Sequence, residues 1–287
     1  MQTHRTDGPD LRLLLVVIVA GIGYLVLRTA LFKQSLPFFD DTDDAMRMVT
    51  VRDLLAGQNW FDPVQHRLNT PWGAEIHWSH WVDLGIGGLI MLLRPFVGQA
   101  NAEIGAGYAW PMILLAVLMW LSARYAYRLV GPGGVLPALI LPLLSPAITV
   151  EFTPGRIDHH NVVIVLTLAI AWTATEGLRR PRFALWCGVL CATALAIAIE
   201  SLPVVVAAIA VMGFLWVMEP GEGRQTRRFG YGFGLGAVVH LMLYRPPSRW
   251  LEAACDVLSP VYVLPAILVA AGFAAVSLLP HPRSRLV

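Results

Sequence analysis

The stretch of this chain best suited to chemistry is an acidic cluster at residues 40–44, Asp40-Asp41-Thr42-Asp43-Asp44. It places four carboxylates within five residues. Crowded carboxylates repel one another and raise each other's pKa, so such a cluster is typical of a site that holds a divalent cation. A helix needs only one acid as its N-cap, but four acids are present here. We therefore expect a metal-binding or catalytic role for Asp43 or Asp44. The alternative is structural, with Asp43 as a helix cap and Asp44 as a salt-bridge partner.

A second group of polar residues lies at 154–161. A Pro-Gly turn is followed by Arg156, Ile157, Asp158, His159 and His160, and an apolar run begins at residue 162. A polar run at the mouth of an apolar helix is costly unless it faces a cavity or a partner. Carboxylate oxygen and imidazole nitrogen are suitable ligands for Mn²⁺ or Mg²⁺, so Asp158, His159 and His160 are candidate ligands. An N-cap role for Asp158 is the alternative.

Residues 60–81 form the third feature, with four tryptophans and three histidines. Tryptophan at a membrane boundary is often an interfacial anchor. His77 and His80 are three residues apart and could share a helical face, either as a metal pair or, as we favour, as hydrogen-bond donors to a phosphate or packing residues. Arg67 could pair with Asp62 or bind a phosphate, and the sequence leaves both alternatives open.

Three further residues are candidate substrate-binding groups. Glu200 lies where two apolar runs meet, although it could also cap the following helix. Arg245 and Arg249 flank Pro246-Pro247 and could bind lipid phosphate, although snorkelling to the membrane surface is an equal alternative. The isolated His240 and the three cysteines are interpreted as packing residues, without a disulfide framework.

The composition predicts the elements that must position these groups. The chain is 56% hydrophobic and 14% charged, with a mean hydropathy of +0.62, and its apolar runs approach the length needed to cross a bilayer. We therefore predict an all-α polytopic transmembrane bundle of eight or nine spans. The expected spans are 11–32, 104–123, 133–150, 160–176, 183–199, 202–218, 229–244 and 261–279, with 84–97 as a re-entrant or interfacial helix.

The basic residues predict the orientation of these spans. More than half of the 21 basic residues lie in short segments that would all be cytoplasmic with both termini inside, as the positive-inside rule favours. The acidic cluster would then be extracytoplasmic. We expect a single membrane domain over 1–287 with extracytoplasmic loops at 33–83, 151–160 and 245–260, and no soluble C-terminal domain. The net charge of +2 says little about nucleic acid, but the sequence has no basic patch interleaved with aromatic residues, and we expect no nucleic-acid partner.

The order of these motifs resembles the C-type membrane glycosyltransferases, and within them the catalytic subunits of oligosaccharyltransferases. Asp43-Asp44 with Arg52-Asp53 is similar to the acidic motif of their first loop. The run from Gly155 to His160 is similar to their second motif, and Pro71-Trp72-Gly73 to a further stretch of the first loop. The resemblance covers roughly residues 11–220.

The resemblance implies a GT-C-like fold and a divalent cation, Mn²⁺ or Mg²⁺, held by Asp44, Asp158, His159 and His160. It implies that Asp43, Asp44 and Asp158 are the catalytic residues. The expected function is transfer of a sugar from a polyprenyl-phosphate-linked donor to an acceptor on the extracytoplasmic face of a bacterial inner membrane. The family has further spans and a soluble acceptor-binding domain, so we expect either a related transferase with another acceptor or an amino-terminal part of such an enzyme, which could be inactive. A transporter or flippase-like protein, or a non-catalytic membrane subunit that handles lipid-linked saccharide, is the alternative.

Overall fold

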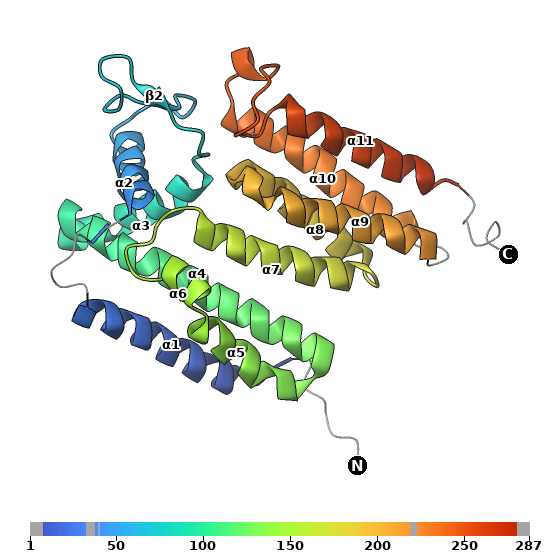
Figure 1. Ribbon diagram of the computed structural model, residues 1–287, viewed down its shortest axis with the longest axis horizontal. Coiled ribbons are helices and arrows are strands. Elements are labelled where there is room, and N and C mark those ends of the chain that lie inside the picture. The colour runs from blue at the N-terminus through green and yellow to red at the C-terminus, as the bar shows by residue number, and fades with distance from the viewer. Residues whose placement is uncertain (1–7, 33–37, 40, 219–222, 280–287) are drawn as a thin grey trace. The chain divides into compact units, whose positions relative to one another are not determined.

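The computed structural model describes residues 8–32, 38–39, 41–218 and 223–279, so that Asp40 of the acidic cluster lies outside the described residues. The predicted all-α class is confirmed within those ranges, where the only strands form one short hairpin (Figure 1). The helices are α1 (Leu11–Phe32), α2 (Thr42–Leu55), α3 (Trp81–Val97), α4 (Gln99–Val130), α5 (Val135–Leu144), α6 (Pro146–Glu151), α7 (His160–Gly177), α8 (Pro181–Ile197), α9 (Leu202–Met218), α10 (Gly223–Tyr244) and α11 (Pro260–Val276). The two strands, β1 (Val64–Gln65) and β2 (Ala74–Glu75), pair antiparallel, and short 3₁₀ turns occupy Pro132–Gly134, Ile199–Ser201 and Pro247–Arg249.

The chain divides into two compact units, which we describe separately. Unit 1 comprises residues 1–57 and 82–168, and unit 2 comprises residues 58–81 and 169–287. The predicted first extracytoplasmic loop is therefore split between them. Its acidic helix α2 belongs to unit 1, whereas its aromatic hairpin belongs to unit 2.

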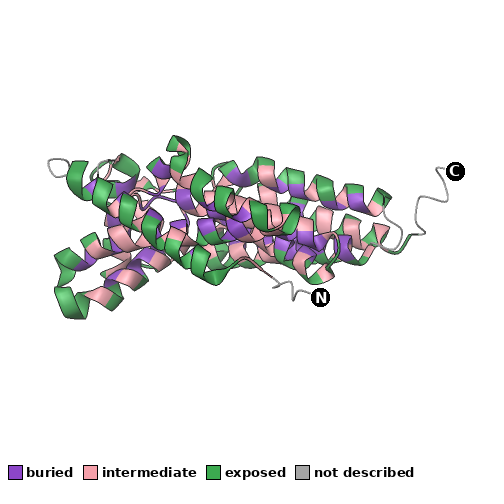
Figure 2. Ribbon diagram, turned by 90° about the horizontal axis from the view of Figure 1, so that it is seen from below, coloured by how far each residue is buried: buried purple, intermediate pink, exposed green. Residues whose placement is uncertain are grey.

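Unit 1 is built around α4, against which α1 and α5 pack. The buried positions of α1 are Leu14, Gly21, Leu25 and Thr29, which follow one helical face, while large apolar residues elsewhere on α1 are exposed. An apolar helix that buries only one stripe is suited to lipid on its other faces. Buried and exposed residues alternate in the same way along the other helices (Figure 2).

Unit 2 is built around α10, which packs against α8 and α11. The contact between α8 and α10 depends on glycine, because a Cβ at Gly188 would collide with the backbone of Phe229 and one at Gly232 with the backbone of Leu185. Small residues that allow two backbones to approach closely are typical of helix pairs in membranes.

The predicted number of spans is not supported. Within the described ranges, three helical segments are long and apolar enough to cross a membrane: Leu11–Phe32, Gln99–Val130 and Ile199–Met218. The expected span 133–150 is interrupted at Ser145, whose extended backbone separates α5 from α6. The cause is Pro146, because a proline disfavours helical conformation in the residue before it. Helices α8 and α11 have 17 residues each, at the lower limit of a spanning helix.

Candidate metal centre

The acidic cluster forms the start of α2, and its members have different surroundings. Asp41 is the N-cap, and its Oδ1 accepts a hydrogen bond from the backbone N–H of Asp43 at 3.0 Å. The cap is therefore Asp41, in place of the Asp43 that the structural alternative named. Asp43 is exposed, whereas Asp44, on the other side of the first turn, is completely buried. Helix formation thus turns one acid toward solvent and the next into the unit.

Asp44 anchors the loop that carries the second motif. Its Oδ1 accepts hydrogen bonds from the backbone N–H groups of Ile157 and Asp158, at 2.7 and 2.9 Å, and its Oδ2 accepts one from Arg156 at 2.9 Å. Burial raises the pKa of Asp44 to about 6, although the Arg156 charge and the two amides act against this. The two acidic motifs, more than 110 residues apart in sequence, therefore meet in space.

Arg156 binds three carboxylates at once. Its Nη1 lies 2.6 Å from Asp41 and 2.9 Å from Asp44, and its Nη2 lies 3.0 Å from Glu151 at the end of α6. Burial lowers the pKa of this guanidinium, but the surrounding carboxylates outweigh burial and raise it above its usual value. Arg156 thus ties α2 and α6 to the loop.

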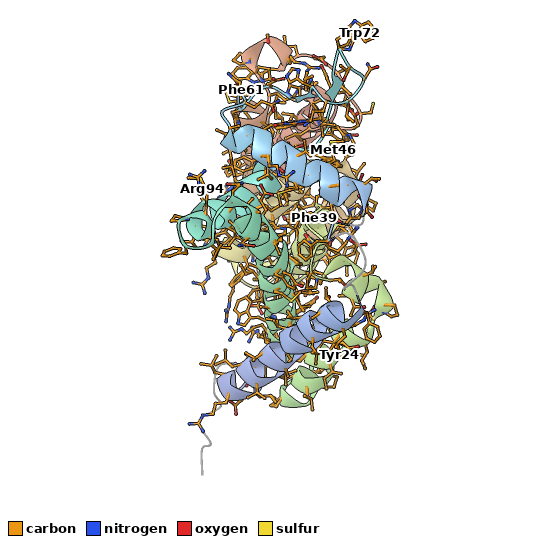
Figure 3. The ribbon with its side chains drawn as sticks, turned by 90° about the vertical axis from the view of Figure 1, so that its left-hand side faces the viewer. Tyr24, Phe39, Met46, Phe61, Trp72 and Arg94 are labelled. Carbon is orange, nitrogen blue, oxygen red and sulfur yellow. The ribbon has the colours of Figure 1, made fainter. Side chains whose placement is uncertain are left out.

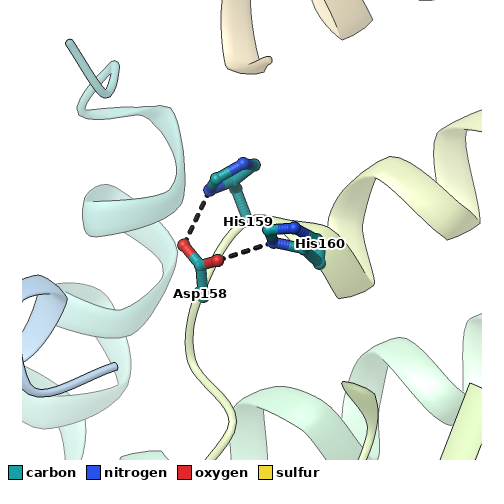
Figure 4. Close-up of side chains that lie close together, drawn as sticks. All are labelled: Asp158, His159 and His160. Atoms are coloured by element: carbon teal, nitrogen blue, oxygen red, sulfur yellow. Dashed lines mark hydrogen bonds and ion pairs between the residues drawn. The ribbon is translucent and has the colours of Figure 1, made fainter. Parts of the chain in front are cut away.

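Asp158 lies between two imidazoles, as Figure 4 shows. Its Oδ1 is 2.7 Å from Nδ1 of His159, and its Oδ2 is 2.6 Å from Nδ1 of His160. Burial raises the pKa of Asp158, but the bonds to both histidines and the charge of Arg47 outweigh it, so the pKa lies well below its usual range. Each of the three side chains offers one ligand atom, and these atoms all lie within 4.8 Å of one another.

Arg47 of α2 connects this triad to α3. Its Nη1 donates to Asp83 of α3 at 3.0 Å, and its Nη2 lies 3.4 Å from Oδ1 of Asp158 and 3.5 Å from Nδ1 of His159. Arg47 is 1% exposed and Asp83 is 0% exposed. A buried ion pair of this kind holds its partners firmly, since neither charge can be left alone in the interior.

The charge balance of the centre favours a bound cation. Five carboxylates (Asp41, Asp44, Asp83, Glu151 and Asp158) face two guanidinium groups, Arg47 and Arg156. This is a formal excess of three negative charges when the histidines are neutral. A buried carboxylate flanked by two imidazoles is also a donor set that divalent metals accept. The residues present therefore fit the divalent cation that the sequence predicts.

The backbone conformation of this loop depends on Gly155, the glycine of the second motif. Gly155 has φ of +98° and donates its backbone N–H to the carbonyl oxygen of Gly107 at 2.9 Å. A Cβ at this position would collide with the carbonyl oxygen of Phe38. Only glycine adopts such a conformation at this close approach without strain.

We predict that Gly155→Ala destabilises the protein by about 2 kcal/mol or more, through backbone strain and the collision with Phe38. The measurement is thermal unfolding of the detergent-solubilised chain. Gly133→Ala is the matched control, since among the described atoms none lies within 4 Å of a Cβ there and its φ is not positive. Equal effects of the two substitutions would contradict the prediction.

The other predicted site residues lie outside this cluster of ligand atoms. Asp44 contacts the backbone of Asp158 but does not belong to the group of side-chain ligand atoms found among the described residues. The predicted substrate-binding residues belong to unit 2, where His77, His80, Arg245 and Arg249 line one cavity. Arg67 is exposed and bonds to Gln65, and Asp62 pairs with His66. Glu200 is exposed in a 3₁₀ turn.

Sequence reasoning gave no role to Arg47, Asp83 or Glu151, and it named Arg156 only as part of a motif. The sequence does contain a signal for Asp83, because this acid directly precedes the apolar run 84–97. Asp158 similarly lies shortly before the apolar run that begins at residue 162. An acid at the mouth of an apolar helix is costly unless it faces a cavity or a partner, and both Asp83 and Asp158 are such acids. Arg47 carried no such signal, since a helix start with acids nearby explains an arginine by ordinary surface pairing.

Comparison with known proteins defines the class of the fold. The fold is similar to that of solved archaeal oligosaccharyltransferases, which are themselves of the GT-C type. The crystal structure of the Archaeoglobus fulgidus oligosaccharyltransferase in complex with zinc and sulfate matches with a TM-score of 0.67 and 11% identity, over 92% of this chain and 35% of that one. Archaeal oligosaccharyltransferase AglB from Archaeoglobus fulgidus, in complex with an inhibitory peptide and a dolichol-phosphate, matches with a TM-score of 0.63 and 11% identity, over 92% of this chain and 33% of that one.

The likeness extends to part of those proteins only. The chain spans about a third of the length of the two solved proteins. No protein-family model and no curated protein matches its sequence. The comparisons therefore establish the fold, and the activity has to be argued from the site.

Proposed function

We propose that this chain is a membrane glycosyltransferase that transfers a sugar from a polyprenyl-phosphate-linked donor to an acceptor on the extracytoplasmic side, assisted by a divalent cation. One observation carries the proposal: Asp158, His159 and His160 gather their ligand atoms within 4.8 Å on a loop held by Asp44. The fold around this loop is similar to that of oligosaccharyltransferases solved with zinc or with a dolichol-phosphate.

In this proposal Asp158, His159 and His160 hold the cation, and the other charged residues position them. A divalent cation in this place supplies Lewis-acid stabilisation of the departing phosphate. Asp44 acts through the loop, because its two oxygens already accept three hydrogen bonds. Arg47 of α2, which also binds Asp83 of α3, helps to keep Asp158 ionised and oriented. The preorganised charges are what such a reaction needs, since reorganising them during catalysis would be costly.

The transfer itself is a direct displacement. The acceptor hydroxyl or amide attacks the anomeric carbon, the bond from this carbon to the phosphate oxygen breaks, and the phosphate leaves with the electron pair. The proton of the acceptor goes to a carboxylate base. We assign this role to Asp43, the exposed acid of α2, because Asp44 is completely buried and its oxygens are occupied.

The test is a transfer assay with the purified full chain in detergent and a polyprenyl-phosphate carrier bearing a labelled sugar. We expect labelled product with Mn²⁺ present, and a loss of about 100-fold or more after chelation, restored by added Mn²⁺. A folded preparation that binds Mn²⁺ but never transfers sugar from the carrier would contradict the proposed activity. Movement of the labelled carrier across vesicles without transfer would favour the transporter alternative.

A further inference from the structure

A cavity of about 230 Å³ in unit 2 lies between the aromatic hairpin and the loop after α10. The hairpin presents Trp60, Phe61, His77 and Trp78, and the end of α10 presents Tyr244. Tyr244 is placed against the hairpin by its hydroxyl, which donates to the carbonyl oxygens of His77 and Trp78 at 3.3 and 3.4 Å. Trp60 is fixed by a hydrogen bond from its Nε1 to the carbonyl oxygen of Leu243 at 2.6 Å. The aromatic wall is therefore anchored at both ends.

A network of ion pairs also lines the cavity. Arg249 binds both oxygens of Glu75, at 3.0 and 3.1 Å, and both oxygens of Glu252, at 2.6 and 2.8 Å. Arg245, which is 5% exposed, lies 3.2 Å from Glu252. Bidentate ion pairs hold the guanidinium and carboxylate groups in fixed orientations. Their remaining hydrogen-bond donors and acceptors are therefore oriented as well.

This network argues against phosphate as the occupant, although the sequence had suggested Arg245 and Arg249 as phosphate-binding residues. Both guanidinium groups already face carboxylates, and Asp256 adds a third carboxylate to the lining. The cavity thus carries a formal excess of one negative charge. An anion would have to compete with internal carboxylates for each arginine.

We propose that this cavity is a binding site for an uncharged sugar ring. A sugar ring has one apolar face, which stacks on aromatic rings, and a rim of hydroxyl groups that both donate and accept hydrogen bonds. Trp78 and its aromatic neighbours offer the first kind of contact, and the carboxylates and guanidinium groups offer acceptors and donors for the second. A volume of about 230 Å³ lies below the usual ~300–1,000 Å³ of small-molecule sites, which suits one ring rather than an oligosaccharide.

The inference uses none of the residues of the metal centre, and it does not depend on the proposed transfer. A chain that binds a sugar here but transfers none would uphold this inference and contradict the proposed function. The reverse result would contradict this inference alone. Binding at this site is therefore measured without any reaction.

The experiment uses saturation-transfer NMR on the detergent-solubilised full chain with the methyl glycosides of glucose, galactose, mannose and N-acetylglucosamine. At least one glycoside is expected to bind, and Trp78→Ala should weaken its affinity by about tenfold or more, which corresponds to about 1.4 kcal/mol. Trp72→Ala is the matched control, because Trp72 belongs to the same hairpin but is 78% exposed, projects away from it (Figure 3) and does not line the cavity.

A second variant keeps the test decisive if Trp78→Ala fails to fold. Glu75→Gln changes an exposed side chain that lines the cavity, and we expect it to weaken glycoside binding by about fivefold through loss of a charged hydrogen-bond acceptor. Inorganic phosphate and putrescine are added as an anionic and a cationic probe. The inference fails if no glycoside binds, if the folded Trp78→Ala and Trp72→Ala variants bind equally, or if only phosphate or putrescine gives a signal that Glu75→Gln changes.

Discussion

The substitution Asp158→Asn is expected to weaken divalent cation binding by about 100-fold. Asn keeps the shape of the side chain but removes the charge that bonds to Nδ1 of both His159 and His160. The Asp158 carboxylate both orients the two imidazole rings and offers a ligand oxygen to the cation. The substitution therefore weakens the orientation and the ligand set together. Mn²⁺ binding to the solubilised chain, measured by electron paramagnetic resonance, checks this expectation.

A control variant and a second variant of the same site test this prediction further. Asp62→Asn is the matched control, since Asp62 also contacts an imidazole, that of His66 at 3.2 Å, but on an exposed part of the hairpin. It should leave Mn²⁺ affinity unchanged. His160→Gln should weaken binding as well, and a folding defect is not expected because the His160 side chain is 43% exposed. Unchanged Mn²⁺ affinity in both Asp158→Asn and His160→Gln would remove the metal centre from this loop.

The second large effect is expected for Arg47→Leu, which should lower the free energy of unfolding by about 3–5 kcal/mol. The guanidinium of Arg47 is the buried partner of Asp83 at 3.0 Å and of Asp158 at 3.4 Å. Leucine would fill part of the volume but would leave two carboxylates, both at most 2% exposed, without this cation. The measurement is equilibrium unfolding in mixed detergent micelles.

Arg52→Leu provides the matched control on the same helix. Arg52 also binds a carboxylate, that of Glu103, but its side chain is 49% exposed, and we expect a loss of about 1 kcal/mol. The double variant Arg47→Leu, Asp83→Leu should recover part of the stability, because it removes one of the two buried carboxylates that lose the Arg47 cation. Similar losses from Arg47→Leu and Arg52→Leu would contradict the assigned role of burial.

Part of the fold could be predicted from the apolar runs and from the residues that typically begin and end helices. The helical class follows from long apolar runs, and the helix after the acidic cluster follows from its capping acids and from Gly57, whose φ of +102° lies just beyond the helix end. The span count failed at 133–150, because a long apolar run does not reveal that Pro146 forces an extended residue in its middle. Apolarity alone also counted as full spans the helices α8 and α11, whose 17 residues lie at the lower limit of a spanning helix.

The candidate site was predicted as two motifs and was assembled by contacts between them. Asp44 and Asp158 were both named from local features, and the structure joins them through the amides of Ile157 and Asp158. The different environments of Asp43 and Asp44 could not be read from the acidic cluster itself. A helix turns neighbouring residues by about 100° relative to each other, so one acid of the pair is exposed while the other is buried.

The sequence by itself determined which side chains are available for chemistry: an acidic helix start, an Asp-His-His run after a Pro-Gly turn, a loop rich in tryptophan and histidine, and two arginines beside Pro246-Pro247. Only the tertiary structure decided which carboxylates the arginines pair with. Arg47 and Arg156 neutralise carboxylates from distant parts of unit 1, and Arg245 and Arg249 neutralise Glu75 and Glu252 in unit 2. The physical reason is that the pairing and pKa of a charge depend on burial and on neighbours within a few ångströms, and long-range packing sets both.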